Sequence, residues 1–113
     1  MAKHCAKIVE GYGISGYVPT ETVLKALASK ARLEILECIQ KGMSNPGEIA
    51  GKLSRHRSTI EKHLRVLLTA KIVKKVPSLT GENHLTIRYN LQGNVRELLA
   101  TVQKLCQEIS KTE

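Results

Sequence analysis

The stretch RSTIEKHLRVLLTA, residues 57–70, decides the fold of this 113-residue chain. Ile60, Leu64, Leu67 and Leu68 recur at the spacing that places side chains on one face of an α-helix. The other face is polar and carries Arg57, Ser58, Glu61, Lys62 and Arg65. The stretch is therefore predicted to be a helix that packs one side on a core and exposes a basic side.

A shorter helix is predicted directly before this stretch. Asn45 suits the cap position and Pro46 the first helical position, and the helix ends near Ser54. Its inward side chains are Ile49, Ala50 and Leu53. Two helices joined by a turn at residues 54–56 are typical of a helix-turn-helix, whose second helix enters the major groove of DNA.

Two further helices are predicted before this pair. The first runs from Thr20 to about Ala28, and Ser29 offers a cap for the second, which stops at Gly42 in a left-handed conformation. The apolar stripe of the second helix comprises Ala31, Leu33, Ile35, Leu36, Cys38 and Ile39. Because the chain has no Phe or Trp, the core has to be built from aliphatic side chains such as these.

After the basic helix, the pattern changes to that of a β-hairpin. Ile72–Val76 and His84–Tyr89 read as two strands, joined by a loop from Pro77 to Asn83. In the second strand, an inward face is predicted for Leu85, Ile87 and Tyr89. Helices followed by a basic helix and a hairpin predict a mainly α fold with a β-hairpin, the winged helix-turn-helix, with its wing at residues 72–91.

Positive charge is concentrated around the predicted helix-turn-helix. The formal net charge is +8, and residues 52–75 hold eight basic residues against one acid, Glu61. The basic residues are Lys52, Arg55, Arg57, Lys62, Arg65, Lys71, Lys74 and Lys75. Such a field favours a polyanionic partner, and double-stranded DNA is the expected one. A solvated basic face without a partner is the alternative.

These segments resemble a known family. LKALASKARLEIL, residues 24–36, is similar to the opening of ArsR-type winged-helix repressors, and EIAGKL (48–53) with RSTIEKHLRVL (57–67) is similar to their helix-turn-helix. The resemblance covers residues 24–91. It implies a homodimeric transcription regulator that binds an inverted-repeat operator, with residues 57–70 as recognition helix and the hairpin as wing.

Three departures from the family pattern limit what the resemblance implies. Metal-sensing members carry a cysteine pair in the helix before the recognition helix, and residues 48–53 contain none. The last helix has no Asp, His and Glu set at ligand spacing, so no metal site of that kind is expected. The family's usual Gly after the recognition helix is Lys71 here, which has to adopt the left-handed stop conformation or end the helix differently.

The C-terminal segment is predicted to be an amphipathic dimerisation helix within residues 92–113. Its apolar seam consists of Val95, Leu98, Leu99, Val102, Leu105, Cys106 and Ile109. Pairing of two copies would place two recognition helices about 34 Å apart, one turn of DNA. Folding of this helix back onto its own domain is the alternative. The expected organisation is an N-terminal arm (1–18), a DNA-binding domain (19–91) and this helix.

The basic side chains are assigned to two kinds of DNA contact. The exposed, leading residues of the recognition helix are the candidates for base edges: Arg57, Ser58, Glu61 and Lys62. Contacts to the phosphates of the DNA backbone are assigned to Lys52, Arg55, Thr59, Arg65, Lys74, Lys75 and Arg88. Glu61 stands four residues from both Arg57 and Arg65, so an ion pair that orients an arginine is an alternative to a base contact.

No cofactor is expected, although GYGISG (11–16) has the spacing of a dinucleotide-binding loop. That fingerprint needs a helix to open at its third glycine within a βαβ unit, and here the helix is predicted only from Thr20. The three cysteines are far apart and odd in number, which argues against a disulfide framework. Cys38 and Cys106 are expected to be small apolar side chains. The alternative is a metal- or thiol-responsive repressor that uses Cys5 and Cys106.

Catalysis is not expected. The chain has no Asp, and its Glu residues are scattered over helix surfaces, so no catalytic constellation is formed. No apolar run is long enough for a membrane span, and a cytoplasmic, nucleoid-associated protein is expected. A DNA-coating architectural protein with little sequence preference is the remaining alternative to a regulator.

Overall fold

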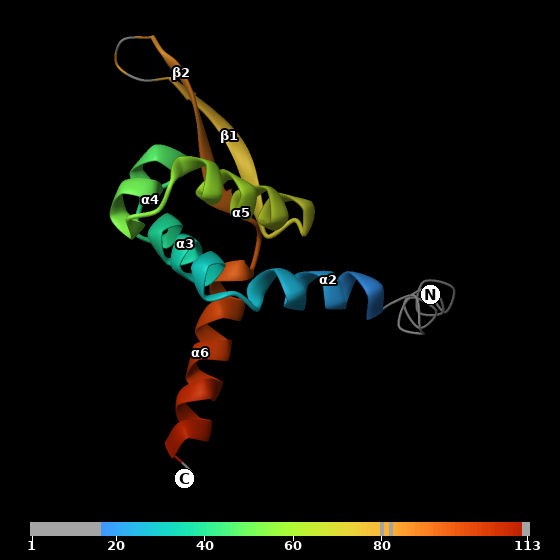
Figure 1. The fold of residues 1–113 in the computed structure, drawn as a ribbon. Helices are drawn as coiled ribbons and strands as arrows, with labels where there is room; N and C mark the ends of the chain where they lie inside the picture. Colours follow the sequence, from blue (N-terminus) through green and yellow to red (C-terminus); the bar gives the residue numbers. More distant parts are fainter. Residues whose placement is uncertain (1–16, 80, 82, 112–113) are drawn as a thin grey trace, which may run out of the picture.

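The computed structural model describes residues 17–79, 81 and 83–111 (Figure 1). The elements are α2 (Tyr17–Leu27), α3 (Lys30–Gln40), α4 (Pro46–Leu53), α5 (Arg57–Thr69), β1 (Val73–Leu79), β2 (Leu85–Leu91) and α6 (Val95–Lys111). This order confirms the mainly α fold with a β-hairpin. Most of the predicted N-terminal arm, with Cys5 and the GYGISG motif, lies outside the described residues.

The core lies where α3, α4, α5 and the base of the hairpin meet. Its fully buried large side chains are aliphatic: Ile35, Leu36, Ile49, Ile60, Leu64, Leu67, Ile72 and Val73. The stripe predicted for residues 57–70 is confirmed, because Ile60, Leu64 and Leu67 are buried on one side of α5 and Leu68 is partly buried against the same core. The prediction for Leu33 is wrong: its side chain is 44% exposed, because only one side of α3 faces the core.

Local capping explains where the helices begin and end. The Ser29 hydroxyl accepts a hydrogen bond from the Arg32 N–H at 3.3 Å, and the Asn45 side chain accepts one from the Gly47 N–H at 2.8 Å, so both predicted caps are confirmed. Gly42 has φ +97°, as expected for the stop after α3.

Two boundaries differ from the sequence prediction. Helix α2 begins at Tyr17 rather than Thr20, which places Pro19 inside its first turn. Proline is tolerated there because the first N–H groups of a helix have no intrahelical partner. Lys71 adopts the left-handed stop conformation with φ +62°, so the chain leaves α5 as the family pattern requires, but without glycine.

The wing is the antiparallel hairpin of β1 and β2, and it is longer than predicted. Pro77 was predicted to start the loop but pairs with Ile87 inside the hairpin. A two-stranded ribbon leaves one edge of each strand open, so a residue without an N–H can be accommodated. The inward face predicted for the second strand is also only partly correct. Tyr89 is buried, whereas Leu85 and Ile87 are 66% and 39% exposed because the hairpin extends beyond the core.

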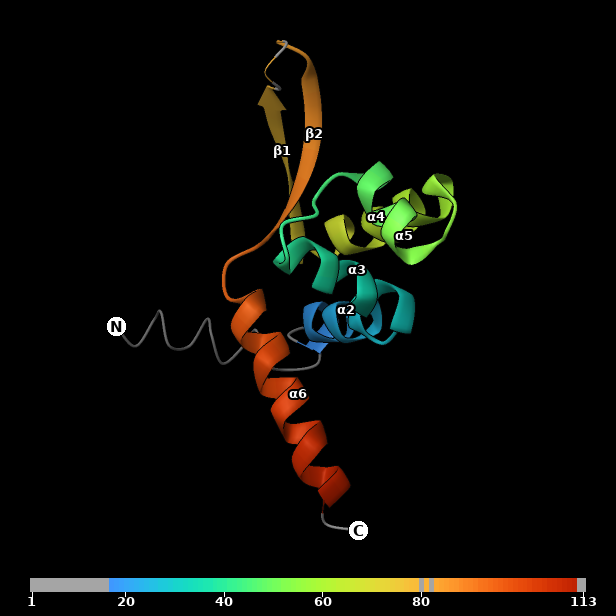
Figure 2. The same cartoon turned by 90° about the vertical axis from the view of Figure 1, so that its left-hand side faces the viewer.

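Helix α6 leaves the body of the molecule on the side opposite to the tip of the wing in both views (Figures 1 and 2). Only Val95 and Leu99, in its first turns, pack partly against the core. The rest of its apolar seam is exposed, including Leu98 (40%), Val102 (44%), Leu105 (54%) and Ile109 (57%). None of the helices in the described part of the chain is long and apolar enough to cross a membrane.

Candidate nucleic-acid interface

The exposed side of α5 forms the centre of a basic face with α4 and the wing. Arg57, Ser58, Glu61, Lys62 and Arg65 are all exposed, whereas the side chain of Thr59 is half-buried on the flank of the helix. Because Ile60, Leu64 and Leu67 fix the opposite side in the core, the rotation of α5 about its axis is set by apolar packing. The four predicted base-contacting residues are therefore brought together on one surface.

Glu61 is engaged by its own helix. Its carboxylate accepts a hydrogen bond from Arg57 Nε at 3.1 Å, in a charge-assisted pair one turn apart. Of the two roles considered for Glu61, this geometry corresponds to the ion pair that orients an arginine, not to a base contact. The pair restricts the direction of the Arg57 side chain and occupies its Nε–H, and the guanidinium has four further N–H donors.

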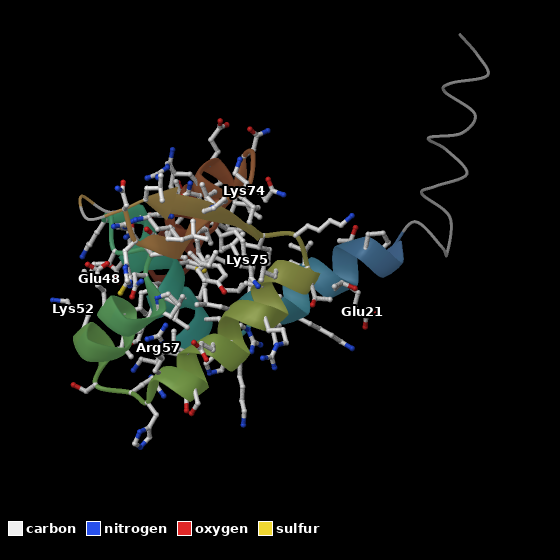
Figure 3. The ribbon with its side chains drawn as sticks, turned by 90° about the horizontal axis from the view of Figure 1, so that it is seen from above. Glu21, Glu48, Lys52, Arg57, Lys74 and Lys75 are labelled. Carbon is white, nitrogen blue, oxygen red and sulfur yellow. The ribbon has the colours of Figure 1, made fainter. Side chains whose placement is uncertain are left out.

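The predicted phosphate-contacting residues are not equivalent. Lys52 is exposed at the end of α4. Arg55, in the turn, has its Nη2 atom 3.8 Å from the carboxylate of Glu34, so part of its charge is compensated within the domain. Seen from above, Lys52, Arg57, Lys74 and Lys75 come from the end of α4, the start of α5 and the wing (Figure 3).

The register of the wing separates its two lysines. Lys75 pairs with Tyr89, and Lys74 pairs with Asn90, so the two lysines lie on opposite faces of the hairpin. Lys75 shares a groove of about 380 Å³ with Arg57 and Glu61, between the wing and the start of α5. Lys75 therefore belongs to the face that α5 presents, and Lys74 belongs to the other face of the wing.

Arg88 has a structural partner in the loop before α4. Its Nη1 atom donates a hydrogen bond at 3.0 Å to the hydroxyl of Ser44, which is buried. The backbone N–H of Tyr89 donates to the Ser44 carbonyl at 3.0 Å. The half-buried Arg88 thus joins the wing to the helix-turn-helix. Residues 88 and 44 are too far apart in sequence for any spacing rule to have found this contact.

A second contact missed by the sequence connects three helices. Arg32, in the first turn of α3, donates to the carbonyls of Ala26 and Lys25 at the end of α2. Its Nη1 lies 3.3 Å from Nδ1 of His63 on α5. Because guanidinium groups only donate, this nitrogen of His63 has to be unprotonated. Burial, then the charges of Arg32 and Arg55, lower the pKa of His63, which favours the neutral ring.

The cysteines in the described part of the chain differ in environment. Cys38 is buried in the core, as predicted, and burial, followed by the charge of Glu37, raises the pKa of its thiol. Cys106 is exposed on α6. Within residues 17–79, 81 and 83–111, no group of three or more His, Cys, Asp or Glu side chains is arranged to hold a metal ion.

Comparison with known proteins identifies the family. The family model described as bacterial regulatory protein, arsR family, matches residues 29–75, from the cap of α3 to the wing. No curated protein matches the chain.

Three solved structures illustrate the structural likeness. The homodimeric winged helix-turn-helix DNA-binding domain of Mb0332 from Mycobacterium bovis is 26% identical, with 84% of each chain covered and a TM-score of 0.71. An ArsR-like transcriptional regulator from Rhodococcus sp. RHA1 is 25% identical, with 88% of each chain covered and a TM-score of 0.62. The cadmium metal-sensor CMTR from Mycobacterium tuberculosis is 30% identical, with 74% of this chain and 83% of that chain covered and a TM-score of 0.57.

The family match spans the α3 cap, both helices of the helix-turn-helix and the start of the first strand of the wing, and the chain covers most of each of these structures. The chain is therefore a winged helix-turn-helix protein that belongs to the ArsR family of bacterial transcription regulators.

Proposed function

We propose that this regulator binds double-stranded DNA sequence-specifically as a homodimer and represses transcription by occupying an inverted-repeat operator in the cytoplasm. The observation that carries the proposal is the exposed side of α5. Arg57, Ser58, Lys62 and Arg65 form a basic surface on a helix whose rotation is fixed by its buried stripe. Its one acid, Glu61, is already paired with Arg57.

Base recognition is assigned to the first two turns of α5. Arg57, oriented by Glu61, would present its terminal N–H groups to a guanine, and Ser58 and Lys62 would reach neighbouring base edges. Glu61 then acts mainly by orienting Arg57 rather than by accepting a hydrogen bond from a cytosine.

Phosphate contacts are assigned to groups that border this surface. Lys52, Arg65 and Lys75 are exposed, and the structure gives none of them an ion pair with another described residue. Such charges add affinity without sequence preference. Contacts from Thr59, Arg55, Lys74 and Arg88 stay predictions of the sequence.

Dimerisation is assigned to α6 together with exposed apolar residues of α2 and α3. Leu24 on α2 and Leu33 on α3 are 59% and 44% exposed, and the seam of α6 adds Leu98, Val102 and Leu105. Complete burial of a fully exposed leucine contributes about 1.5–3 kcal/mol, so burying the exposed half of each of these side chains contributes about 1 kcal/mol and favours association of two copies. The Mycobacterium bovis relative is homodimeric, which supports the same assembly here. Residues 19–91 would then be the DNA-binding part and residues 92–113 the dimerisation part.

The test of the proposal is a ratio of affinities at fixed salt. Fluorescence anisotropy should give a Kd for a selected inverted repeat that is at least 10³-fold lower than the Kd for the same duplex with both half-sites scrambled. A DNA-coating protein would bind both duplexes equally, and equal affinities would contradict the proposal.

A metal-responsive regulator is a second candidate, because the chain is 30% identical to a cadmium sensor. The exposed Cys106 is an accessible free thiol, and Cys5 lies outside the described residues. Cadmium titration of the wild type and of Cys106→Ser, followed by thiolate absorbance in the ultraviolet, tests this candidate. An identical response from both proteins would exclude Cys106 as a ligand.

A further inference from the structure

A groove of about 630 Å³ lies between α2 and α5. Its apolar wall consists of Ala26, Val66 and Ala70, and its cationic wall consists of Lys25, Arg32, Lys62 and Arg65. The volume lies in the range of small-molecule sites, which are typically apolar clefts with a few fixed polar groups.

The charge of the groove is one-sided. Among the described residues that line it, none carries a carboxylate. The ammonium of Lys25 is 3.3 Å from Glu21, whereas Lys62 and Arg65 have no ion pair with any described residue. Lys62 and Arg65 are thus two cations of the groove without a compensating acid, and such charges favour an anionic occupant.

The groove is held open by bonds that do not involve an occupant. Arg32 ties the last carbonyls of α2 to His63 on α5, so the two walls are fixed relative to each other at one end. Preorganisation of this kind reduces the ordering cost of binding.

The apolar wall of the groove favours an organic anion over an inorganic one. Val66 is 41% exposed although it is a large aliphatic side chain, and it faces this groove beside the buried Ala26 and Ala70. An inorganic anion would leave that wall exposed to water. A carboxylate attached to a ring or a short hydrocarbon chain would satisfy both walls.

The chain's own N-terminus is the less suitable occupant. Residues 1–16 carry Lys3 and Lys7 against Glu10, so their net charge has the same sign as that of the groove. Charge complementarity therefore favours a separate, anionic molecule.

We infer that the α2–α5 groove binds a small amphipathic carboxylate. Lys62 and Arg65 belong both to this groove and to the basic surface of α5, so an occupied groove competes with DNA for the same two cations. The regulator would therefore release DNA when the carboxylate accumulates, a consequence that rests on the proposed function. Binding of the carboxylate itself does not depend on DNA.

Calorimetric titration of the full chain without DNA tests the inference, with 1-naphthoate as probe. The neutral 1-naphthamide and inorganic phosphate serve as comparison ligands. Lys25→Glu reverses a charge inside the groove, and Lys30→Glu makes the same change on an exposed lysine outside it. Val66→Ser removes part of the apolar wall without changing charge.

The expected result is saturable binding of 1-naphthoate, with a Kd at least tenfold higher for Lys25→Glu and for Val66→Ser and within twofold of wild type for Lys30→Glu. The naphthamide and phosphate should bind at least tenfold more weakly. Equal losses from both lysine variants, equal binding of naphthamide, or phosphate binding as tight as that of naphthoate would each overturn the inference. The last result would assign the groove to a phosphate of the DNA backbone.

In the DNA arm, saturating 1-naphthoate should weaken the binding of a selected duplex at least fivefold for wild type and less than twofold for Lys25→Glu. Unchanged DNA affinity, despite confirmed naphthoate binding, would overturn the competition. A protein that binds naphthoate but no duplex would contradict the proposed function and leave the carboxylate site standing.

Discussion

Helices α5 and α6 carry nearly the same pattern of apolar residues but lie in opposite environments. In α5, Ile60, Leu64 and Leu67 have no exposed surface. In α6, Leu105 and Ile109 are more than half exposed, and the helix projects from the body (Figure 2). Apolar periodicity therefore predicts that a stripe will be buried, but it does not tell whether the same chain or a second copy buries it.

The largest expected effect comes from truncating the same residue type in each helix. Leu64→Ala should lower the free energy of unfolding by about 2–5 kcal/mol, because it opens a cavity in the core. Leu105→Ala should change it by less than about 0.5 kcal/mol in a monomer, because Leu105 is already largely solvated. Urea denaturation at a protein concentration well below the dimer Kd compares the two, and equal losses would remove the contrast.

The exposed seam of α6 is expected to pair two subunits. Leu105→Glu should weaken self-association at least about 30-fold, because burying an unpaired carboxylate in the seam costs more than about 2 kcal/mol. Ala100→Glu places the same carboxylate on the opposite side of α6 and should leave the dimer intact. Sedimentation equilibrium measures both, and a dimer unaffected by Leu105→Glu would mean that another surface pairs the subunits.

Substitutions on the polar face of α5 and on the wing should affect DNA binding differently. Those on α5 should reduce sequence specificity, and those on the wing should reduce the affinity for any duplex. Arg57→Ala should cost about 1–3 kcal/mol on the selected site and reduce discrimination there. Lys75→Ala should weaken the binding of selected and scrambled DNA alike. It should also reduce by about one the slope of the logarithm of the binding constant against the logarithm of the salt concentration, whereas Lys74→Ala, on the other face of the wing, should have less effect. Anisotropy titrations at three salt concentrations measure these effects. Identical profiles for Arg57→Ala and Lys75→Ala would contradict the assignment of the recognition helix.

The smallest expected effect is a pH dependence from His63 on α5. Its pKa is lowered in the folded protein, so the unfolded chain binds the proton more readily. The stability of the folded protein should therefore fall as the pH drops below about 6.5, the ordinary pKa of histidine, and this contribution should be constant above that value. His63→Gln should lose less stability than wild type between pH 7.5 and pH 5.5 in urea titrations. Equal losses would mean that burial and the charge of Arg32 do not hold the ring neutral.

Local rules explain why much of the fold could be predicted from the sequence. The caps at Ser29 and Asn45 and the buried stripe of α5 each depend on residues within a few positions of one another, and the left-handed conformation of Lys71 was one of two local alternatives. The pair of Arg57 and Glu61 is also local, and it was one of two alternatives for Glu61.

Contacts between distant segments could not be predicted in this way. Arg32 meets His63, and Arg88 meets Ser44, across 31 and 44 positions respectively, where no periodicity connects them. The exposure of Leu85 and Ile87 depends on how far the hairpin extends past the core, and alternation along a strand carries no information on that length. The α2–α5 groove depends in the same way on tertiary packing.

Selection of bound fragments from a random pool of duplex DNA tests whether the protein binds DNA sequence-specifically as a homodimer. We expect a two-fold symmetric consensus whose half-sites are centred about 10–10.5 base pairs apart, or a multiple of that spacing, because a dimer would present two α5 helices. With Leu105→Glu, the same selection should return a single half-site with lower affinity. A wild-type protein that enriches no consensus, or an asymmetric one, would contradict the account of a homodimeric, sequence-specific regulator.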